Sequence, residues 1–276
     1  MTDPDALSLR AATPDDYRWL LHFLPQLETG DPLPSEESFR THYQGRLSLF
    51  AAPAAAPVAI AIVDVLADTG YVRVIAVDPH ARGQGVGLAL MRAIAIALRE
   101  QKCSHWCLNV KVDNHVAIRL YERVGMRLAY HSHALRCPWA ATDTLPSSTQ
   151  PVVAQSITER DDPAIERAWS LPAGQLAGWR AMPGQHLIGL SDPGDPTNFR
   201  LGFARANPSH PGVFPFRVSD PTLARSLLEA VRPLFDGALT SVGIVVEDDE
   251  ALASLLLAHG AERKMHLAHL RGVIPW

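Results

Sequence analysis

The sequence predicts an α/β (α+β) protein built from two copies of one unit, each a mixed, mostly antiparallel sheet flanked by helices. Three observations predict this architecture. Strand and helix patterns alternate up to residue 137, a Pro- and Ser-rich stretch follows at 138–151, and the pattern then begins again. The 276 residues are enough for two domains of roughly 100–200 residues each. We therefore expect domains at 1–137 and 152–276, joined by a linker at 138–151.

Local signals define the elements of the first copy. Thr13 is typical of a helix N-cap, and Pro14 with Asp15 and Asp16 suits the first turn of that helix. Asp68-Thr69-Gly70 indicates a hairpin turn, and Gly125 indicates a helix C-cap. In chain order we expect a strand at 7–11, helices starting at Pro14 and covering 35–44, strands at 47–52, 58–66 and 71–77 with a loop at 51–57, a helix at 85–100, a strand at 105–111, a helix at 114–124 and a strand at 127–136.

An internal repeat supports the second copy. Residues 108–136 align without a gap with 243–271, and seven of these 29 positions are identical, where chance gives roughly two. The starts of the two copies are also similar, with RAATPDD at 10–16 and SITERDD at 156–162. The repeat therefore indicates two copies of one α/β unit.

Charge and cysteine content exclude several classes of protein. The 25 basic and 29 acidic residues give a net charge of −4, which provides no general attraction to nucleic acid or to an acidic membrane. No apolar stretch is long enough to span a membrane. Cys103, Cys107 and Cys137 do not suggest a disulfide framework, and the N-terminus has no secretory signal, so we expect a cytoplasmic protein. His105 lies between two of these cysteines, but no second ligand pair follows, so we expect no metal.

The segment VDPHARGQGVGLALM at 77–91 carries the strongest functional signal. A strand is expected to end at Val77, and a turn then leads through Arg82-Gly83-Gln84-Gly85-Val86-Gly87 into a helix. Glycines allow close backbone approach and direct N–H groups at a ligand, and a helix N-terminus favours an anion. The segment therefore predicts a pyrophosphate cradle. It lacks the Lys of a P-loop, and its G-x-G-x-G spacing after a five-residue turn departs from the dinucleotide fingerprint, so both nucleotide interpretations are weaker.

The loop resembles the acetyl-CoA-binding signature R/Q-x-x-G-x-G/A of the GNAT superfamily of N-acetyltransferases, with Arg82, Gly85 and Gly87 at the defined positions. Residues 110–127 resemble a second motif of that family, N-x-x-A-x-x-L-Y-x-x-x-G-[FM]. The matching residues are Asn114, Ala117, Leu120, Tyr121, Gly125 and Met126. The resemblance covers about residues 7–137.

The resemblance implies direct transfer of an acetyl group from acetyl-CoA to an amine of a small molecule or peptide. It implies that two strands splay apart beside the loop, and that residues 75–77 (Ile75, Ala76 and Val77) present backbone groups to the pantetheine arm. The N–H groups of residues 82–87 would hold the pyrophosphate. Tyr121 would protonate the departing thiolate, unless it is a core aromatic. Asn114 would bind the cofactor, cap its helix, or do both.

The second half resembles the degenerate C-terminal GNAT-like domain of some tandem acetyltransferases. Asp249 stands at the place of Asn114 and Leu256 at the place of Tyr121. Aligning the helix after the glycine loop with residues 223–228 places three other residues at the signature positions: Ser219, Thr222 and Ala224. We therefore expect acetyl-CoA to bind in the first copy alone.

The general base is the open question at this point. Many family members carry a Glu on the strand before the loop, but YVRVIAV at 71–77 contains no carboxylate. Asp64 is a candidate base, and Arg73 faces either solvent or an acidic substrate group. His131 and His133 alternate on one strand face and either line a site or are ordinary strand residues. The missing Glu leaves one alternative, a non-catalytic acyl-CoA-binding or sensing module.

Overall fold

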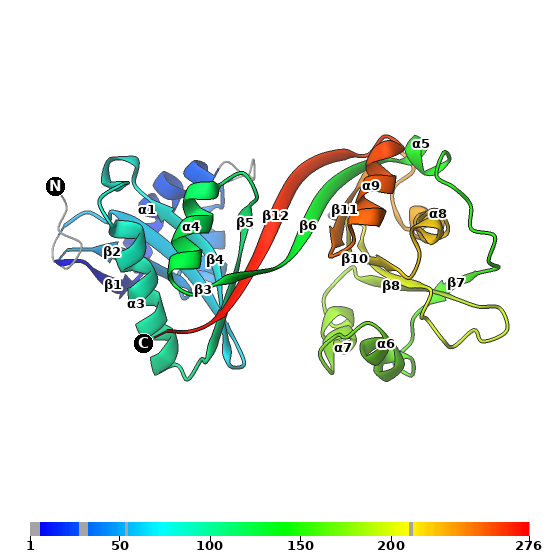
Figure 1. The fold of residues 1–276 in the computed structure, drawn as a ribbon, viewed down its shortest axis with the longest axis horizontal. Helices are drawn as coiled ribbons and strands as arrows, with labels where there is room; N and C mark the ends of the chain where they lie inside the picture. Colours follow the sequence, from blue (N-terminus) through cyan, green and yellow to red (C-terminus); the bar gives the residue numbers. More distant parts are fainter. Residues whose placement is uncertain (1–5, 28–32, 53–54, 210–211, 276) are drawn as a thin grey trace. The chain divides into compact units, whose positions relative to one another are not determined.

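The computed structural model describes residues 6–27, 33–52, 55–209 and 212–275 (Figure 1). Residues 53 and 54 of the expected loop at 51–57 lie outside the described part. The chain divides into two compact units. Unit 1 comprises Met1–Ala129 and Ala268–Trp276, and unit 2 comprises Tyr130–Leu267.

Unit 1 contains an N-terminal run of helices and strands that follows the expected order closely. Its principal elements are β1 (Ser8–Ala11), α1 (Tyr17–Phe23), α2 (Glu36–Ser38), β2 (Leu47–Ala51), β3 (Ala59–Leu66), β4 (Thr69–Val77), α3 (Val86–Glu100), β5 (His105–Lys111) and α4 (His115–Arg123), together with parts of β6 (Arg127–Pro138) and β12 (Glu262–Val273). Short helical turns η2 (Pro14–Asp16), η3 (Leu24–Leu27), η4 (Phe39–Tyr43) and η5 (Pro79–Ala81) connect them.

The sheet of unit 1 is mixed and mostly antiparallel, as the sequence predicts. Strands β1, β2, β3 and β4 pair with their neighbours in antiparallel register, whereas β4 and β5 are parallel. The final part of β12 is next to β5 in the strand order. The parallel pair, β4 and β5, is the one whose strands are connected through the glycine loop and α3.

The two faces of this sheet bury different helices because side chains alternate along each strand. Ala59 and Ala61 of β3 pack in the core that contains α3 and α4. Ile60 and Ile62 of the same strand pack in a second core with Leu20 of α1. Figure 1 shows α3 and α4 on one side of the sheet and α1 on the other.

The second half of the last strand, β12, completes unit 1, whereas its first half up to Leu267 belongs to unit 2. Ala268, Leu270 and Ile274 are buried in the same core as α3, and the Ile274 N–H donates a hydrogen bond to the Ser104 carbonyl at 2.9 Å. Strand β6 conversely leaves unit 1 at residue 129 and continues in unit 2. This division differs from the domains expected at 1–137 and 152–276. The reason is that apolar residues near the C-terminus fit the core of the first copy.

The stretch expected as a linker at 138–151 begins as ordered structure inside unit 2. Its first residues form α5 (Trp139–Thr142), and Trp139 packs against Phe235 with ring centroids 5.8 Å apart. Trp139 and Leu145 both belong to the main core of unit 2. Burial of these apolar side chains explains why the Pro- and Ser-rich composition does not produce a free connection over its whole length.

Unit 2 repeats the layered arrangement. Its further elements are β7 (Val153–Ser156), α6 (Asp162–Ala168), α7 (Gln175–Arg180), β8 (His186–Ser191), β9 (Gly202–Asn207), β10 (Gly212–Val218), η6 (Pro221–Leu223), α8 (Ala224–Val231), η7 (Arg232–Leu234), β11 (Ser241–Glu247) and α9 (Glu250–Ala258). The strand order is β6-β11-β10-β9-β8-β7, with β10 and β11 parallel and the other described pairs antiparallel. One core lies under α8 and α9, and a smaller one lies under α6 and α7.

Local geometry confirms the repeat. The Asn114 side chain caps α4 by accepting a hydrogen bond from the Ala117 N–H, and Asp249 caps α9 in the same way through the Leu252 N–H. Gly125 and Gly260 end these helices with left-handed φ angles of 86° and 99°. These two helices and the strands after them are therefore equivalent structures.

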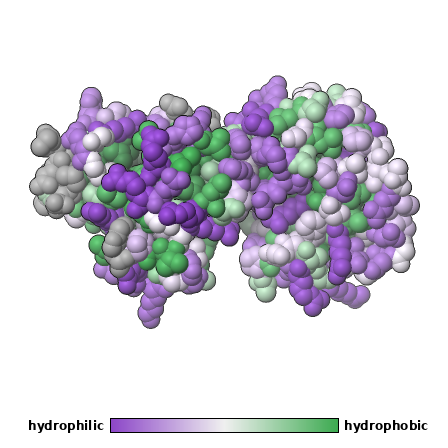
Figure 2. All heavy atoms as spheres, viewed as in Figure 1, coloured by the Kyte–Doolittle hydropathy of each residue, from purple (hydrophilic) through white to green (hydrophobic). Residues whose placement is uncertain are grey.

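The described residues contain no helix long and apolar enough to cross a membrane. On the face shown in Figure 2, hydrophilic side chains predominate and hydrophobic ones are scattered among them.

Candidate active site

Strands β4 and β5 pair over their first halves and then separate. Their parallel register runs from Thr69 opposite His105 to Val72 opposite Leu108, with no pairing recorded beyond it. The other edge of β4 remains paired with β3 up to Val77. Only the edge of β4 that faces β5 is therefore open over Ile75, Ala76 and Val77, and this is where the resemblance implies a splay.

The glycine loop begins where this open edge ends. After the turn η5, Gly83 and Gly85 adopt left-handed φ angles of 75° and 82°, a region that favours glycine. Helix α3 follows at once, and its first hydrogen bonds run from the Leu88 and Ala89 N–H groups to the Gly85 carbonyl. The N–H groups of Val86 and Gly87 therefore lie at the open, positive end of a 15-residue helix. This arrangement fits a pyrophosphate.

Side chains of the loop fasten it to the rest of unit 1. The Arg82 Nε donates to the Val77 carbonyl and its Nη2 to the Gln26 Oε1, both at 3.0 Å. The Gln84 Nε2 donates to the His80 carbonyl at 2.7 Å. Arg82 thus positions the loop, and it occupies the Val77 carbonyl that sequence reasoning assigned to the cofactor arm.

Gly87 brings α4 against the start of α3. A Cβ at this position would lie 3.1 Å from the Leu120 Cδ2, tighter than most real Cβ contacts. Close packing against α4 therefore favours glycine at position 87, whether or not a ligand binds there. The same contact places the turn of α4 that carries Tyr121 beside the loop.

Tyr121 is buried, with 8% of its surface exposed, and burial raises its pKa to about 12. None of the described residues forms a hydrogen bond with its hydroxyl. A hydroxyl with this pKa stays protonated at neutral pH and can donate a proton or a hydrogen bond to a developing anion. Its ring also packs in the core, so the core-aromatic interpretation and the acid interpretation are compatible.

Asp64 and Arg73 pair with each other. The Asp64 carboxylate on β3 lies 3.1 Å from the Arg73 Nη1 and 3.3 Å from the Arg46 Nη1. Two guanidinium groups thus engage the two oxygens of this carboxylate. The Asp64 carboxylate is therefore shared by two ion pairs. The Arg73 guanidinium contacts this carboxylate as well as solvent.

Sequence reasoning missed a second pair at the end of β4. The His22 Nε2 on α1 lies 2.9 Å from the Asp78 Oδ2, and Asp78 directly follows Val77. This hydrogen bond, followed by that from the His80 N–H, holds the pKa of Asp78 below its ordinary value. A carboxylate that orients an imidazole is a common arrangement for a group that accepts protons. No local signal identifies His22, because its partner is 56 positions away.

The second copy lacks the loop rather than only its glycines. Asp78 accepts a hydrogen bond from the His80 N–H at the start of η5, and Asp220 accepts one from the Thr222 N–H at the start of η6. After η5 the chain forms the glycine loop, whereas η6 leads directly into α8 at Ala224. The structural equivalence therefore differs from the alignment that placed Ser219, Thr222 and Ala224 at the signature positions. The alignment of the two copies assumed a loop of equal length before each helix, whereas the second copy has none between η6 and α8.

His131 and His133 belong to unit 2, whereas the glycine loop belongs to unit 1. The His133 Nε2 contacts the Glu250 Oε2 at 2.8 Å, and its ring stacks on His266 with centroids 4.1 Å apart at 21°. Donor atoms of His133, Glu250 and His266 lie within 4.8 Å of one another. The lone pairs of nearly parallel imidazoles do not converge on one point, so this group is a stacked pair with a carboxylate. The expected absence of a metal stays a prediction.

A protein-family model matches part of unit 1. Residues 16–126 match the model of the Acetyltransferase (GNAT) family. The matched segment is less than half of the chain, and it contains the glycine loop and α4 of unit 1.

Individual relatives extend the likeness to the whole chain. A GCN5-related N-acetyltransferase from Sphaerobacter thermophilus has a TM-score of 0.66 at 18% identity and covers 100% of this chain and 98% of its own. A tandem GNAT protein from the clavulanic acid biosynthesis pathway has a TM-score of 0.58 at 15% identity and covers 98% of both chains. At these identities the likeness shows a shared tandem fold.

A curated relative matches over a shorter region. A mycothiol acetyltransferase from Saccharopolyspora erythraea is 41% identical over 56 residues. This match spans 20% of the present chain and 18% of the relative. The chain therefore covers less than a fifth of that protein's length in this comparison.

Proposed function

We propose that unit 1 transfers an acetyl group from acetyl-CoA to an amine of a small molecule or peptide. The observation that carries the proposal is the open edge of β4 ending at a left-handed glycine loop and a helix N-terminus. Such a site offers N–H groups to a pyrophosphate and backbone groups to an extended arm. The family-model match over residues 16–126 and the short match to a mycothiol acetyltransferase support the same reaction class.

Acetyl-CoA supplies an activated thioester, and the residues of the chain bind it and manage protons. The N–H groups of residues 83–87 hold the pyrophosphate, since the Arg82 N–H donates to the Pro79 carbonyl, while residues 75–77 align the arm. Alignment of two reactants in one site contributes much of the rate of such a transfer. Asn114 caps α4 and keeps Tyr121 on the turn beside the loop.

Two side chains have the proton roles in this proposal. His22, oriented by Asp78, accepts a proton from the acceptor amine. Tyr121 donates its proton to the sulfur as the carbon–sulfur bond breaks, because its raised pKa keeps it protonated until then. The new carbon–nitrogen bond and the free thiol complete the exchange, and a proton returns from His22 to Tyr121 through solvent.

Thiol release tests this proposal directly. The full chain is incubated with acetyl-CoA and a panel of small-molecule and peptide amines, and free thiol and acetylated product are measured together. Amine-dependent thiol release that disappears in Gly85→Glu supports the proposal. Tight acetyl-CoA binding with no turnover on any amine would favour the non-catalytic acyl-CoA-binding module instead.

A further inference from the structure

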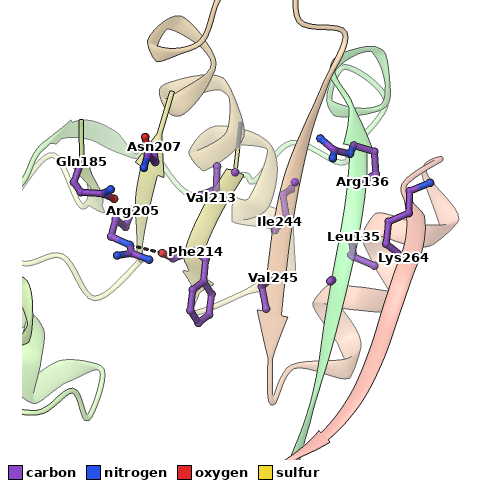
Figure 3. A pocket seen from close by; sticks show the side chains of 13 residues that line it. Leu135, Arg136, Gln185, Arg205, Asn207, Val213, Phe214, Ile244, Val245 and Lys264 are labelled. Carbon is purple, nitrogen blue, oxygen red and sulfur yellow. Dashed lines mark hydrogen bonds between the residues drawn. The ribbon is translucent and has the colours of Figure 1, made fainter. Parts of the chain in front are cut away.

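Unit 2 contains a hollow of about 370 Å³ on the open face of its sheet (Figure 3). Along the strands that line it, residues alternate between two faces. Leu135 and Ile244 are buried in the core under α8 and α9, whereas Arg136 and Val245 belong to the opposite face. The hollow therefore lies on the face that α8 and α9 do not cover, and its volume is in the range of small-molecule sites.

The charge of this hollow differs from the charge of its unit. Residues 130–267 contain eleven basic and fifteen acidic side chains, a net charge of −4. The described lining residues nevertheless include Arg136, Arg205 and Lys264 and no carboxylate. Lys264 is paired with Glu262 at 2.6 Å, and Figure 3 shows its side chain directed away from Phe214 and Arg205. The positive charge that faces the hollow thus comes from the two arginines.

Arg205 is held in a fixed orientation. Its Nε donates to the Phe214 carbonyl at 2.5 Å, and its guanidinium lies 5.1 Å from the Trp179 ring centroid and 6.0 Å from that of Phe214. Its two Nη groups form no hydrogen bond with the described residues. Burial, which removes part of the water around the guanidinium, lowers the pKa of Arg205. An anion would replace the missing hydration.

Arg136 provides a second guanidinium on the other side of the hollow. It forms no hydrogen bond or ion pair with the residues that the structure describes. Figure 3 shows it on β6, with Val213, Ile244 and Val245 between it and Arg205. Between the two arginines, the Val245 side chain lies on the face of the hollow, whereas those of Val213 and Ile244 are buried on the opposite face, and the Phe214 side chain is 40% exposed. The hollow therefore combines fork-shaped cation donors with an apolar and aromatic surface.

We propose that this hollow in unit 2 binds a small organic anion that carries a carboxylate or a phosphate on a flat apolar body. The Nη groups of Arg205 present two parallel donors, the geometry that matches either anion. The apolar body would lie against Phe214 and Val245. This site is separate from the glycine loop of unit 1, so the proposal does not depend on acetyl transfer.

Four probes test the chemistry with the full chain. Benzoate and phenyl phosphate carry the two anions on one ring, and benzamide and benzyl alcohol carry the ring without a charge. Ligand-observed NMR titration gives each affinity. We expect both or either anion to bind, and the neutral probes to bind at least tenfold more weakly, because a charge-assisted bidentate contact is worth about that factor. The probe that binds more tightly, benzoate or phenyl phosphate, shows whether the hollow prefers a carboxylate or a phosphate.

Matched variants locate the site. Arg205→Gln should weaken the anion about tenfold or more, and Arg205→Lys should also weaken it, because a single ammonium cannot replace the fork. Arg136→Gln should weaken it less, because three strand spacings separate the two arginines. Arg200→Gln, at an exposed arginine of the same unit, should leave the affinity unchanged. Gly85→Glu should also leave it unchanged. Equal binding of benzoate and benzamide, unchanged affinity in both Arg136→Gln and Arg205→Gln, or loss only in Gly85→Glu would overturn the proposal.

Discussion

Gly272 of β12 lies against the Gly125 carbonyl oxygen so closely that a Cβ at position 272 would stand 2.9 Å from that oxygen. The same Cβ would stand 3.2 Å from the Met126 Cα. Both neighbours are backbone atoms, which cannot turn aside as a flexible side chain can. The missing side chain at 272 therefore lets the C-terminal strand approach the first copy.

Gly272→Val should destabilise the protein by about 1–3 kcal/mol, the usual cost of forcing extra atoms into a packed site. Urea unfolding measures the loss. Gly45→Val is the matched control, because a Cβ at Gly45 meets no atom within 4 Å and its backbone is not left-handed. Equal losses in the two variants would show that β12 does not depend on this close approach.

Gly85→Glu should abolish acetyl-CoA binding. The carboxylate would stand where N–H groups converge on a pyrophosphate, and the left-handed backbone adds about 1–2 kcal/mol of local strain. Gly174→Glu provides a control with the same strain, since Gly174 also precedes a helix, with φ of 81° against 82° for Gly85. Calorimetry should find one acetyl-CoA per chain in the wild type and in Gly174→Glu, and none in Gly85→Glu. A stoichiometry of two would show that unit 2 binds the cofactor without the loop.

Tyr121→Phe should lower kcat by about 10²–10⁴-fold and leave the acetyl-CoA affinity nearly unchanged. The substitution keeps the buried ring and removes only the proton donor. Steady-state kinetics and calorimetry on the same sample separate the two effects. Tyr71→Phe is the control, because Tyr71 lies on the paired part of β4 and its hydroxyl accepts a hydrogen bond from the Asn109 Nδ2. Normal turnover of Tyr121→Phe would leave this residue as a core aromatic.

His22→Gln should lower kcat by about 10²-fold if this imidazole accepts the amine proton. Asp78→Asn should have a smaller effect, because Asp78 orients the ring through a single hydrogen bond. The acetyl-CoA affinity should not change in either variant. His42→Gln, at an exposed histidine of the same unit, serves as the control. If His22→Gln and His42→Gln have the same kcat as the wild type, another group or water removes the proton.

Asp16 should give unit 1 an acid-sensitive contribution to stability. The Arg10 guanidinium, with bonds of 2.7 and 2.8 Å, lowers the pKa of Asp16 from 3.8 to about 2, assisted by Thr13. A carboxyl whose pKa is lower in the folded state stabilises the fold above its unfolded pKa. This contribution, about 2 kcal/mol or less, is lost as the pH falls from about 4 to about 2.

Asp16→Asn tests this contribution by urea unfolding at several pH values. The wild type should be more stable than the variant at pH 6, and the difference should shrink steadily below pH 4. A difference that stays constant down to pH 2 would show that the charge of Asp16 does not contribute to stability.

The glycine loop and α4 are the elements that the sequence predicts best. Left-handed positions at Gly83 and Gly85 require glycine, and the Asn114 cap and the Gly125 end of α4 depend on residues within a few positions. Local conformational rules therefore reach these features directly. The base that we propose is different, because His22 meets Asp78 only after α1 packs on the sheet. Arg82 likewise shows its role only when its side chain meets Val77 and Gln26.

The sequence by itself determined that the chain contains two copies of one α/β unit, because each copy carries its own strand and helix periodicity and its own caps. It also determined that one copy has a glycine loop. The tertiary structure alone decided which copy each last strand completes. Residues 127–136 and 262–271 are equivalent in the repeat, so either strand satisfies the local rules of either copy. The choice depends on long-range fit, in which Ala268, Leu270 and Ile274 fill the core of unit 1 and Gly272 allows the approach.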